Sequence, residues 1–288
     1  MEHKTLASGF SMPTLGLGCW PMGGYRGPDS THDERDAATL ACAIEKGITH
    51  FDTAEMYGRG HSEELLGHVL KNHDRSKLFI ASKACRGSLA SKEALKDACK
   101  ASLARVGTDY FDLYYIHWYI PEYSLEEQMK AMEELYEEGL IKNIAVSNFK
   151  VETFKKAQAL CKYPIVANQV HYNLILRGPE RDGLVEFCQN NDVMLVAYRP
   201  VELGKLANTG NSVMLDLAGK CTGHTHAQVA INWLISQKNV VTIFGCLKKE
   251  YIDENLGALG WSMSDEDIEY ARKNYGGQID VSDSVPLG

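Results

Sequence analysis

This sequence of 288 residues lacks the features that place a protein in a membrane or on nucleic acid. No run of about 18 apolar residues occurs, so no segment is long enough to cross a bilayer as a helix. The opening stretch up to Gly18 lacks the long apolar core of a signal peptide. Blocks of lysine and arginine are missing, and the net charge of −8 opposes general affinity for polyanions. These absences predict a soluble, cytoplasmic protein without membrane or nucleic-acid partners.

Disulfide and metal motifs are missing as well. The eight cysteines are scattered, and no two of them form a Cys-x-x-Cys pair. This spacing predicts reduced thiols, many of them buried, in an intracellular chain. His224 and His226 stand close together, but they lack the i,i+4 spacing of helical ligands and a third ligand nearby. We interpret them as surface residues at the start of a helix and expect no metal site.

A Rossmann fingerprint is also absent. The stretch GLGCWPMGG follows an apolar run, but its spacing differs from G-x-G-x-x-G at the start of a helix. What the chain does contain is a regular alternation of short apolar runs and amphipathic helical stretches, without a linker or a change in composition. This alternation predicts one α/β domain over residues 1–288, a (β/α)₈ TIM barrel. A doubly wound open sheet is the competing layout.

The eight expected strands are short apolar runs rich in β-branched and aromatic residues. They cover Thr14–Cys19, Thr49–Thr53, Leu78–Lys83, Phe111–His117, Lys142–Ser147, Ile165–His171, Val193–Tyr198 and Val240–Gly245. Helices are expected over 33–47, 91–107, 124–139, 151–161 and 226–237. The first residues predict a β-hairpin that covers one end of the barrel, with Ser8 and Gly9 in its turn.

Several residues have the chemistry of helix ends. Ser91 and Ser124 are expected N-caps, and Glu127 stands three residues after Ser124 as in a capping box. The expected C-terminal stops are Gly47, Gly107 and Gly139.

Polar residues gather where the expected strands end, which is where barrel enzymes place their chemistry. Asp52 ends the second strand and leads to Tyr57, Lys83 ends the third strand, and His117 ends the fourth. Later strands end with or carry Ser147, Asn148, Asn168, Gln169, Tyr198 and Arg199. The pattern predicts a polar site at one mouth of the barrel.

The first four of these residues could polarise a carbonyl group and deliver a proton. A free tyrosine has a pKa of about 10, and a nearby ammonium makes the phenol more acidic. Lowering the pKa of Tyr57 to about 7 would take roughly 4 kcal/mol of differential stabilisation. Asp52 would hold Lys83 in place, and His117 would hydrogen-bond the carbonyl.

This set contains no hydride source, so a redox reaction would require a cofactor. Each residue taken alone also has a plainer interpretation as a cap, a surface lysine, a core histidine or a rim aromatic. On this pattern alone, a barrel isomerase or a metal hydrolase therefore remains an alternative.

Six stretches, in order, resemble signatures of the aldo-keto reductase family. They are FDTAEMYG, LFIASKA, DLYYIHW, GLIKNIAVSNF, NQVHYN and IFGCLKKEYIDENLGAL. The resemblance runs from GLGCW to the final helices and keeps the intervals between the motifs. It implies a (β/α)₈ barrel that binds NADP(H) in an extended form without a Rossmann domain.

The resemblance implies that Asp52, Tyr57, Lys83 and His117 are catalytic. Tyr57 would be the general acid when an aldehyde or ketone is reduced to an alcohol. Lys83, paired with Asp52, would lower the pKa of the phenol, and His117 would orient the carbonyl.

The same resemblance implies a set of cofactor contacts. Ser147, Asn148 and Gln169 match positions that hold the carboxamide of nicotinamide, and Tyr198 matches the aromatic residue that stacks on its ring. Val201 to Lys205 match the loop over the pyrophosphate, while Glu254 and Asn255 match the adenine contacts. The complete expected set is Gly18, Cys19, Trp20, Asp52, Ser147, Asn148, Gln169, Tyr198, Arg199, Pro200, Val201, Leu203, Lys205, Gly245, Cys246, Lys248, Glu254 and Asn255.

Two departures from the family pattern concern the phosphate groups. Arg199 stands where many members have serine, and we expect it to contact phosphate. Gly245 and Tyr251 stand where many members have basic residues, which leaves Lys248 and Lys249. We therefore expect NADPH as the cofactor, preferred over NADH by less than in members that have the full basic set. NADH remains a possible cofactor.

The expected substrate site is largely aromatic and apolar. It comprises Trp20, Tyr25, Met56, Tyr57, His117, Trp118 and Tyr119. The short segment after the fourth strand and the short tail after Tyr275 predict an open mouth that accepts varied aldehydes and ketones. The alternative is that these aromatics only pack the rim of the barrel.

The expected partner is a small carbonyl compound or alcohol, and the expected state is a monomer or a weak homo-oligomer. An alternative function on the same fold is a cofactor-binding regulatory or channel-associated subunit, as some members of the family are.

Overall fold

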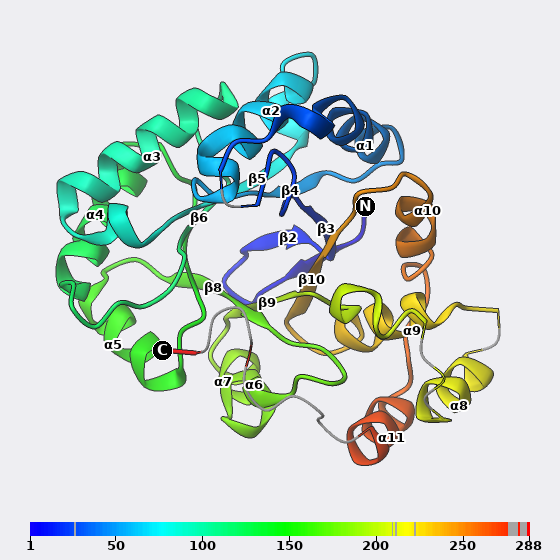
Figure 1. Cartoon of the computed structure of the whole chain (residues 1–288). Coiled ribbons are helices and arrows are strands. Elements are labelled where there is room, and N and C mark those ends of the chain that lie inside the picture. Colours follow the sequence, from blue (N-terminus) through cyan, green and yellow to red (C-terminus); the bar gives the residue numbers. More distant parts are fainter. Residues whose placement is uncertain (26, 209, 211, 222, 276–281, 283–286) are drawn as a thin grey trace.

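Eight parallel strands close into a barrel at the centre of the molecule, in the order β10-β3-β4-β5-β6-β7-β8-β9 (Figure 1). This computed structural model describes residues 1–25, 27–208, 210, 212–221, 223–275, 282, 287 and 288. The strands are β3 (Leu15–Gly18), β4 (His50–Asp52), β5 (Phe79–Ala84), β6 (Leu113–Ile116), β7 (Ile144–Ser147), β8 (Ile165–His171), β9 (Met194–Tyr198) and β10 (Val240–Gly245). Because β10 pairs with β3, the sheet has no free edge. The predicted (β/α)₈ barrel is confirmed, and the open-sheet alternative is excluded.

Helices surround the barrel as an outer layer (Figure 1). They are α1 (Asp33–Glu45), α2 (His61–Leu70), α3 (Lys92–Val106), α4 (Leu125–Glu137), α5 (Val151–Leu160), α6 (Gly178–Arg181), α7 (Leu184–Asn190), α8 (Ser212–Lys220), α9 (His226–Ile235), α10 (Glu250–Leu256) and α11 (Asp265–Asn274). Each of the five helices expected from the sequence is present, within two residues of its predicted ends.

The predicted N-caps Ser91 and Ser124 are confirmed, but the capping box expected between Ser124 and Glu127 has only one of its two bonds, from the backbone N–H of Glu127. The side chains of Ser91 and Ser124 accept hydrogen bonds from the first turns of α3 and α4. Gly107 ends α3 with a left-handed φ of 69°, which a residue without a Cβ adopts at little cost. A complete capping box, with both reciprocal bonds, lies at the start of α9 between Thr225 and Gln228, where the sequence analysis had not placed one.

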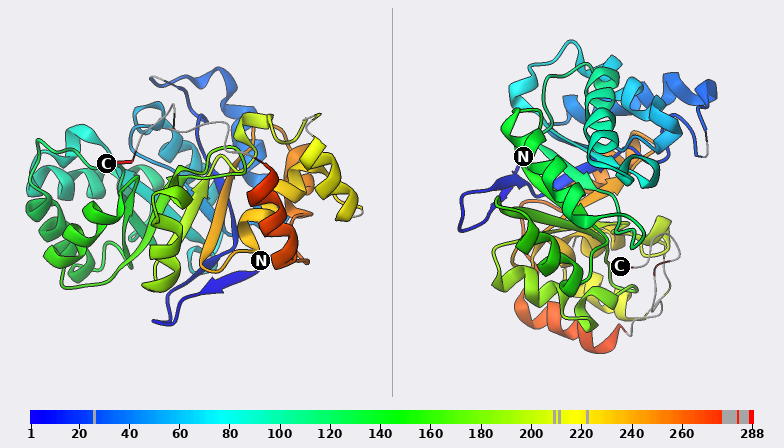
Figure 2. Two further views of the ribbon diagram at one scale, coloured as in Figure 1. Left: turned by 90° about the horizontal axis from the view of Figure 1, so that it is seen from below. Right: turned by 90° about the vertical axis from the view of Figure 1, so that its left-hand side faces the viewer.

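The predicted N-terminal hairpin is present. Strands β1 (His3–Thr5) and β2 (Ser11–Pro13) pair in antiparallel fashion, and Gly9 in the turn has φ 94°. Figure 2 shows the hairpin protruding at one end of the barrel. The backbone N–H groups of Ala7 and Ser8 donate to Asp192, which precedes β9. The hairpin therefore covers the end where the strands begin and leaves the opposite mouth for function.

The core has two parts, separated by the sheet. Residues that point outward, such as Tyr114 and Ile116 on β6, pack against the helices. Their neighbours Leu113 and Tyr115 point inward and pack with Met12 of the hairpin inside the barrel. This alternation follows from the two-residue period of a strand. It also places His50 and Asp52 of β4 on the same face.

None of the helices that the structure describes is both long and apolar enough to cross a membrane. The eight cysteines all lie in the described part of the chain and are unpaired. Burial raises the pKa of Cys188 to about 12, so this thiol is protonated at neutral pH.

Candidate functional site

A buried ion pair joins the ends of two neighbouring strands at the mouth of the barrel. Lys83 on β5 donates from Nζ to Oδ1 of Asp52 on β4 and, at 2.7 Å, to the carbonyl oxygen of Thr53. The two side chains are 0% and 1% exposed. From across the barrel, Nε2 of Gln169 on β8 donates to Oδ2 of Asp52 at 2.8 Å. Three strands therefore fix the positions of the ammonium and the carboxylate.

The electrostatics of this pair keep Lys83 charged. Burial lowers the pKa of Lys83, but the negative charge and hydrogen bond of Asp52 outweigh that effect, and the net pKa is raised. A desolvated ammonium without such a partner would tend to lose its proton.

Tyr57 lies next to the ion pair, on a short 3₁₀ segment, Tyr57–Gly60, that follows β4. Its hydroxyl is 3.5 Å from Nζ of Lys83. The chain turns sharply after Tyr57, because Gly58 and Arg59 have φ of 55° and 54°. A Cβ at Gly58 would lie 2.3 Å from the carbonyl oxygen of Gly23, so only glycine fits there.

The pKa of Tyr57 differs from the sequence-based expectation. Burial raises it to about 12, although the charge of Lys83 acts in the opposite direction. A net decrease toward 7 was therefore wrong for the chain alone, because the desolvation of the phenol exceeds the effect of one cation. The phenol is consequently protonated at neutral pH and holds a proton that can be donated.

His117 follows β6 and completes this half of the site. Its ring is edge-on to that of Tyr57, with centroids 6.0 Å apart. Burial, with a smaller contribution from Lys83, lowers the pKa of His117 well below 6.5, so the imidazole is neutral. Nδ1 is buried without a hydrogen-bond partner among the described residues. The structure thus brings the four expected catalytic residues together.

Glu55 belongs to this half of the site and was missed by the sequence analysis. Its Oε1 accepts from the backbone N–H of Cys85 at 2.5 Å, and its Oε2 accepts from Oγ of Ser88 at 3.0 Å. These bonds tie the loop before Tyr57 to the residues that follow Lys83. The signal in the sequence was a lone acidic residue between the motif aspartate and tyrosine.

The second half of the site is a row of polar side chains at the ends of β7, β8 and β9. Ser147 Oγ donates to the carbonyl oxygen of Gln169 at 2.9 Å, and Asn148 Nδ2 donates to Ser147 Oγ at 2.9 Å. The hydroxyl of Tyr198 donates to Oδ1 of Asn148 at 3.2 Å. Asn148 also donates to the carbonyl oxygen of His117 at 3.1 Å, which links the two halves of the site.

The segment after β9 is fixed by residues that the sequence analysis did not single out. The buried carboxylate of Glu202 accepts from Nε2 of His171 and from Nδ2 of Asn173, each at 2.7 Å. Burial raises the pKa of Glu202, but the hydrogen bonds and charge of these partners lower it more. His171 lies two residues after Gln169 on β8, hence on the same face of the strand. That spacing was the signal available in the sequence.

The remaining expected cofactor residues lie at the ends of β3 and β10 or in the segments that follow β3, β9 and β10. Gly18 and Gly245 are paired neighbours on β3 and β10. Cys19 is buried and donates from its backbone N–H to the carbonyl oxygen of Asp52 at 2.8 Å. Pro200 is buried, whereas Val201 is half-buried. Leu203 and Lys205 are exposed.

After β10 the chain continues into helix α10 of the outer layer. Cys246 is buried, and its thiol bonds to the carbonyl oxygen of Lys248 at 2.8 Å. Lys248 is exposed, with Nζ 5.7 Å from the ring centre of Tyr251. Glu254 is half-buried and Asn255 is buried on α10.

Aromatic side chains line part of the mouth. The rings of Trp20 and Tyr25 meet edge-on at 5.5 Å, and Cζ of Arg199 lies 5.7 Å from the ring centre of Trp20. The ring of Trp118 lies 4.5 Å from that of His117. Met56 and Tyr25 are 42% and 64% exposed.

Tyr119 has a different environment, since it packs edge-on against the buried ring of Phe149 at 6.0 Å.

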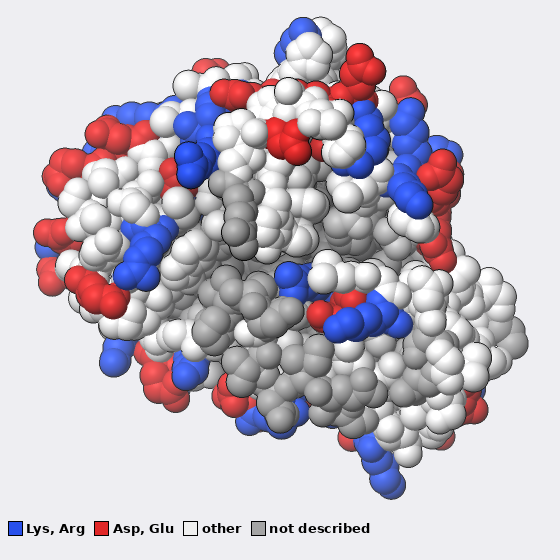
Figure 3. Space-filling view, viewed as in Figure 1, with Lys and Arg blue, Asp and Glu red and all other residues white. Residues whose placement is uncertain are grey.

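Figure 3 shows the face viewed in Figure 1, with many of its charged side chains around the periphery. The expectation of an open mouth rested partly on the tail after Tyr275, most of which lies outside the described residues.

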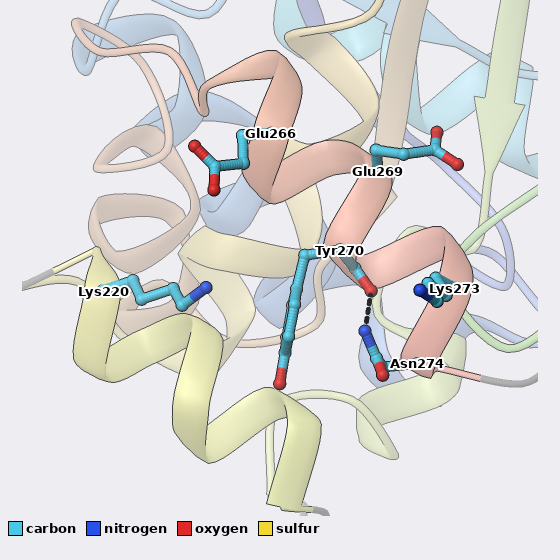
Figure 4. A pocket seen from close by; sticks show the side chains of 6 residues that line it. All are labelled: Lys220, Glu266, Glu269, Tyr270, Lys273 and Asn274. Carbon is cyan, nitrogen blue, oxygen red and sulfur yellow. Dashed lines mark hydrogen bonds between the residues drawn. The ribbon is translucent and has the colours of Figure 1, made fainter.

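A separate hollow of about 500 Å³ lies on the outer layer, between α8 and α11 (Figure 4). Its lining includes none of the expected catalytic or cofactor residues; it consists of Lys220, Glu266, Glu269, Tyr270, Lys273 and Asn274. Nζ of Lys220 lies 4.0 Å from the ring centre of Tyr270.

His224, which stands close to His226 in the sequence, stacks on the ring of Trp261 at 4.0 Å. The described residues contain no group of three or more potential ligands arranged to hold a metal ion.

Comparison with known proteins gives one consistent answer. The model of the aldo/keto reductase family matches residues 14–275. Methylglyoxal reductase YeaE from Escherichia coli (strain K12) is 34% identical, over 96% of each chain. The crystal structure of the thermostable aldo-keto reductase Tm1743 with the inhibitor epalrestat has a TM-score of 0.90 and 42% identity, covering 95% of this chain and 99% of that one.

An aldo/keto reductase from Klebsiella pneumoniae, solved with NADP and acetate, has a TM-score of 0.82 and 30% identity. The alignment covers 98% of this chain and 97% of that one. The match of the family model over nearly the whole barrel, together with this agreement in sequence and fold, shows that the chain belongs to the aldo/keto reductase family.

Proposed function

We propose that this protein is an NADPH-dependent oxidoreductase that reduces aldehydes and ketones to alcohols. The observation that carries the proposal is the buried Asp52–Lys83 ion pair beside the protonated phenol of Tyr57. The name of the Escherichia coli relative, a methylglyoxal reductase, and the NADP complex of the Klebsiella relative support it.

Tyr57 acts as the general acid in this proposal. A bound reduced nicotinamide would supply the hydride. As negative charge develops on the carbonyl oxygen, the phenol of Tyr57 donates its proton to that oxygen, since an alkoxide is a stronger base than a phenolate. Lys83, 3.5 Å from the hydroxyl, stabilises the phenolate that remains, and Asp52 holds the ammonium in place. The neutral imidazole of His117 orients the carbonyl by hydrogen bonding.

The other half of the mouth fits the nicotinamide end of a dinucleotide. Ser147, Asn148 and Gln169 offer hydroxyl and amide groups at adjacent strand ends, which suit a carboxamide. Tyr198 presents a partly exposed ring whose hydroxyl is anchored by Asn148, as a stacking residue requires.

The rest of the dinucleotide would follow the rim outward. Residues 199–205 would cover the pyrophosphate, with Arg199 contacting phosphate. Lys248 would bind the 2′-phosphate, and Glu254 with Asn255 would contact the adenine. The exposed position of Lys248 suits a charged group that approaches from solvent.

The substrate class follows from the wall of the mouth. Trp20, Tyr25, Met56 and Trp118 are aromatic or apolar and partly exposed, so they favour carbonyl compounds with apolar or planar substituents. Small reactive aldehydes would also enter such a mouth.

The direct test is consumption of NADPH by the purified protein with a panel of carbonyl compounds, without added metal. Methylglyoxal and a nitrobenzaldehyde should both be reduced, measured as loss of absorbance at the reduced-nicotinamide band. If neither NADPH nor NADH is consumed with any carbonyl, the enzyme proposal fails. Binding of the dinucleotide without turnover would instead favour a cofactor-binding subunit. Activity that a chelator abolishes and zinc restores would indicate another mechanism.

A further inference from the structure

The segment after β9 has a backbone conformation that most side chains disfavour. Arg199, Glu202 and Leu203 have φ of 57°, 46° and 53°, in the left-handed region. Such conformations persist where surrounding contacts hold them, and they concentrate where proteins clamp ligands. Segment 199–204 therefore needs an anchor.

The carboxylate of Glu202 provides this anchor. It is 2% exposed and accepts from His171 Nε2 and Asn173 Nδ2, each at 2.7 Å. Nδ2 of Asn173 also donates to the carbonyl oxygen of Arg199 at 2.8 Å. The strained stretch is thus tied at two points, Arg199 and Glu202, to the last residue of β8 and to the loop that follows it.

His171 extends the anchor to the ring of Tyr198. The two rings are stacked, with centroids 5.1 Å apart and planes inclined by 24°. Nδ1 of His171 is 2.8 Å from Oγ of Ser282. Because Nε2 faces a carboxylate, that nitrogen carries a hydrogen, and Glu202 thereby sets the orientation of the imidazole. One side chain therefore links the segment, the aromatic ring and a residue of the C-terminal region.

We propose that Glu202 and His171, with Asn173, form a cofactor-positioning anchor that holds segment 199–204 and the Tyr198 ring ready for a nicotinamide dinucleotide. The inference rests on the proposed function. The three are positioning residues, because they act through the segment and the ring. A segment that is ordered before binding does not consume cofactor binding energy for its own ordering, so the anchor increases affinity.

The negative charge of Glu202 is offset within the anchor. A buried carboxylate close to a segment that would cover a pyrophosphate opposes the binding of an anion, because like charges repel. Here the carboxylate is bonded to His171 and Asn173, and the positive charge of Arg199 also acts on it. The anchor thus gains strong charge-assisted bonds while its charge is offset locally.

Two variants of the full chain test the anchor. Glu202→Gln removes the charge with little change in volume, and His171→Phe keeps a ring against Tyr198 but removes the Nε2 donor. Quenching of intrinsic fluorescence by NADPH should show Kd raised at least about tenfold in each variant, or about 1.4 kcal/mol. KM for NADPH should rise similarly, while kcat at saturating NADPH stays within about threefold of wild type.

The double variant and a matched control separate the anchor from general destabilisation. If the residues act as one pair, the double variant should bind about as weakly as the weaker single variant. Glu180 is the control, because it accepts from Tyr172, the residue after His171, at 2.6 Å and pairs with Arg272. Glu180→Gln should lower thermal stability and leave the Kd for NADPH unchanged.

The outcomes distinguish this inference from the function on which it rests. A wild-type protein that binds no dinucleotide would overturn the proposed function. A wild-type protein that binds NADPH, with unchanged Kd in both anchor variants, would overturn the anchor alone. If the variants fail to fold, hydrogen exchange of the wild type decides. Amides of 199–204 should be protected without cofactor, and protection that appears only with NADPH would overturn the proposal.

Discussion

Asp52 and His50 are two buried, titratable residues on the same face of β4, but their surroundings differ. Asp52 lies at the mouth, where the ammonium of Lys83 and the amide of Gln169 are its hydrogen-bond partners. His50, 0% exposed, lies deeper in the same barrel, and neither of its ring nitrogens has a partner among the described residues. Burial lowers the pKa of His50 to about 4, so it is neutral. Two buried polar groups on one strand thus differ in whether their environment supplies hydrogen-bond partners.

The packing around His50 explains how the deeper layer accommodates it. The ring meets Phe79 edge-on at 5.0 Å. A Cβ at Gly16 of β3 would lie 2.3 Å from Nδ1, so the imidazole occupies space that a larger residue would fill. The layer at the mouth, with Asp52 and Lys83, thus holds a buried ion pair that chemistry can use. The deeper layer, around His50, is packed like an apolar core.

The largest expected effect comes from removing the proton donor of the mouth layer. Tyr57→Phe keeps the ring and its packing but removes the transferable proton. We expect kcat and kcat/KM to fall at least about 10²-fold, in the range typical of general-acid catalysis. NADPH binding, measured by fluorescence, should survive, since Ser147, Asn148, Gln169 and Tyr198 are untouched. Wild-type turnover in a folded variant would mean that the phenol is a rim residue.

Breaking the ion pair should affect both activity and stability. Lys83→Met removes the cation beside the phenol and leaves the carboxylate of Asp52 buried without it. Turnover should fall nearly as far as in Tyr57→Phe, and unfolding free energy in urea should fall by about 3–5 kcal/mol. Adding Asp52→Asn should recover stability without activity. A single variant as stable as wild type would show that the pair is not electrostatically coupled to folding.

His50, in the deeper layer, should make the stability of the protein depend on pH. Because the pKa of folded His50 is about 4, unfolded chains bind a proton between pH 4 and 6.5 that the native protein does not. Native stability should therefore fall as the pH is lowered through this window, by roughly 3 kcal/mol from this residue. Urea unfolding of His50→Leu should lack that part of the slope, while His117 contributes equally to both proteins. Parallel pH profiles for the two proteins would contradict the assignment.

The smallest expected effect is on the Kd for NADPH and comes from Lys248, which belongs to neither layer. Lys248 is exposed, so its contribution to binding a 2′-phosphate is weakened by solvent. Lys248→Ala should raise the Kd for NADPH by several-fold, on the order of 1 kcal/mol, and leave that for NADH unchanged. Equal weakening of both dinucleotides would show that this lysine does not read the phosphate. Lys249→Ala is the matched control, one residue along the chain.

Much of the barrel was predictable because its signals are local. Each strand is an apolar run of the right length, each helix has a consistent pattern, and caps such as Ser91 are chemically distinctive. The clustering of Asp52, Lys83 and His117 followed from one rule, that parallel strands end on the same side of a closed sheet.

What escaped prediction depends on register and depth. The contact between Glu202 and His171 joins a loop to a neighbouring strand, and sequence spacing does not specify which side chains meet there. The raised pKa of Tyr57 is a matter of desolvation, which a sequence does not measure. Glu55 was not singled out because one acidic residue in a loop has no distinctive spacing, although it ties two loops together.

The closure of β10 onto β3 has a consequence for how the protein forms. Leu15 and Thr242 are Cα partners, although they come from early and late in the sequence. Contacts between such distant residues slow folding, because a long chain loses much freedom before they form. During synthesis, Asp52, Tyr57, Lys83 and His117 leave the ribosome well before the strand that closes their barrel. Until that strand arrives, a nascent chain exposes unpaired strand edges, which makes this interval the one most vulnerable to aggregation.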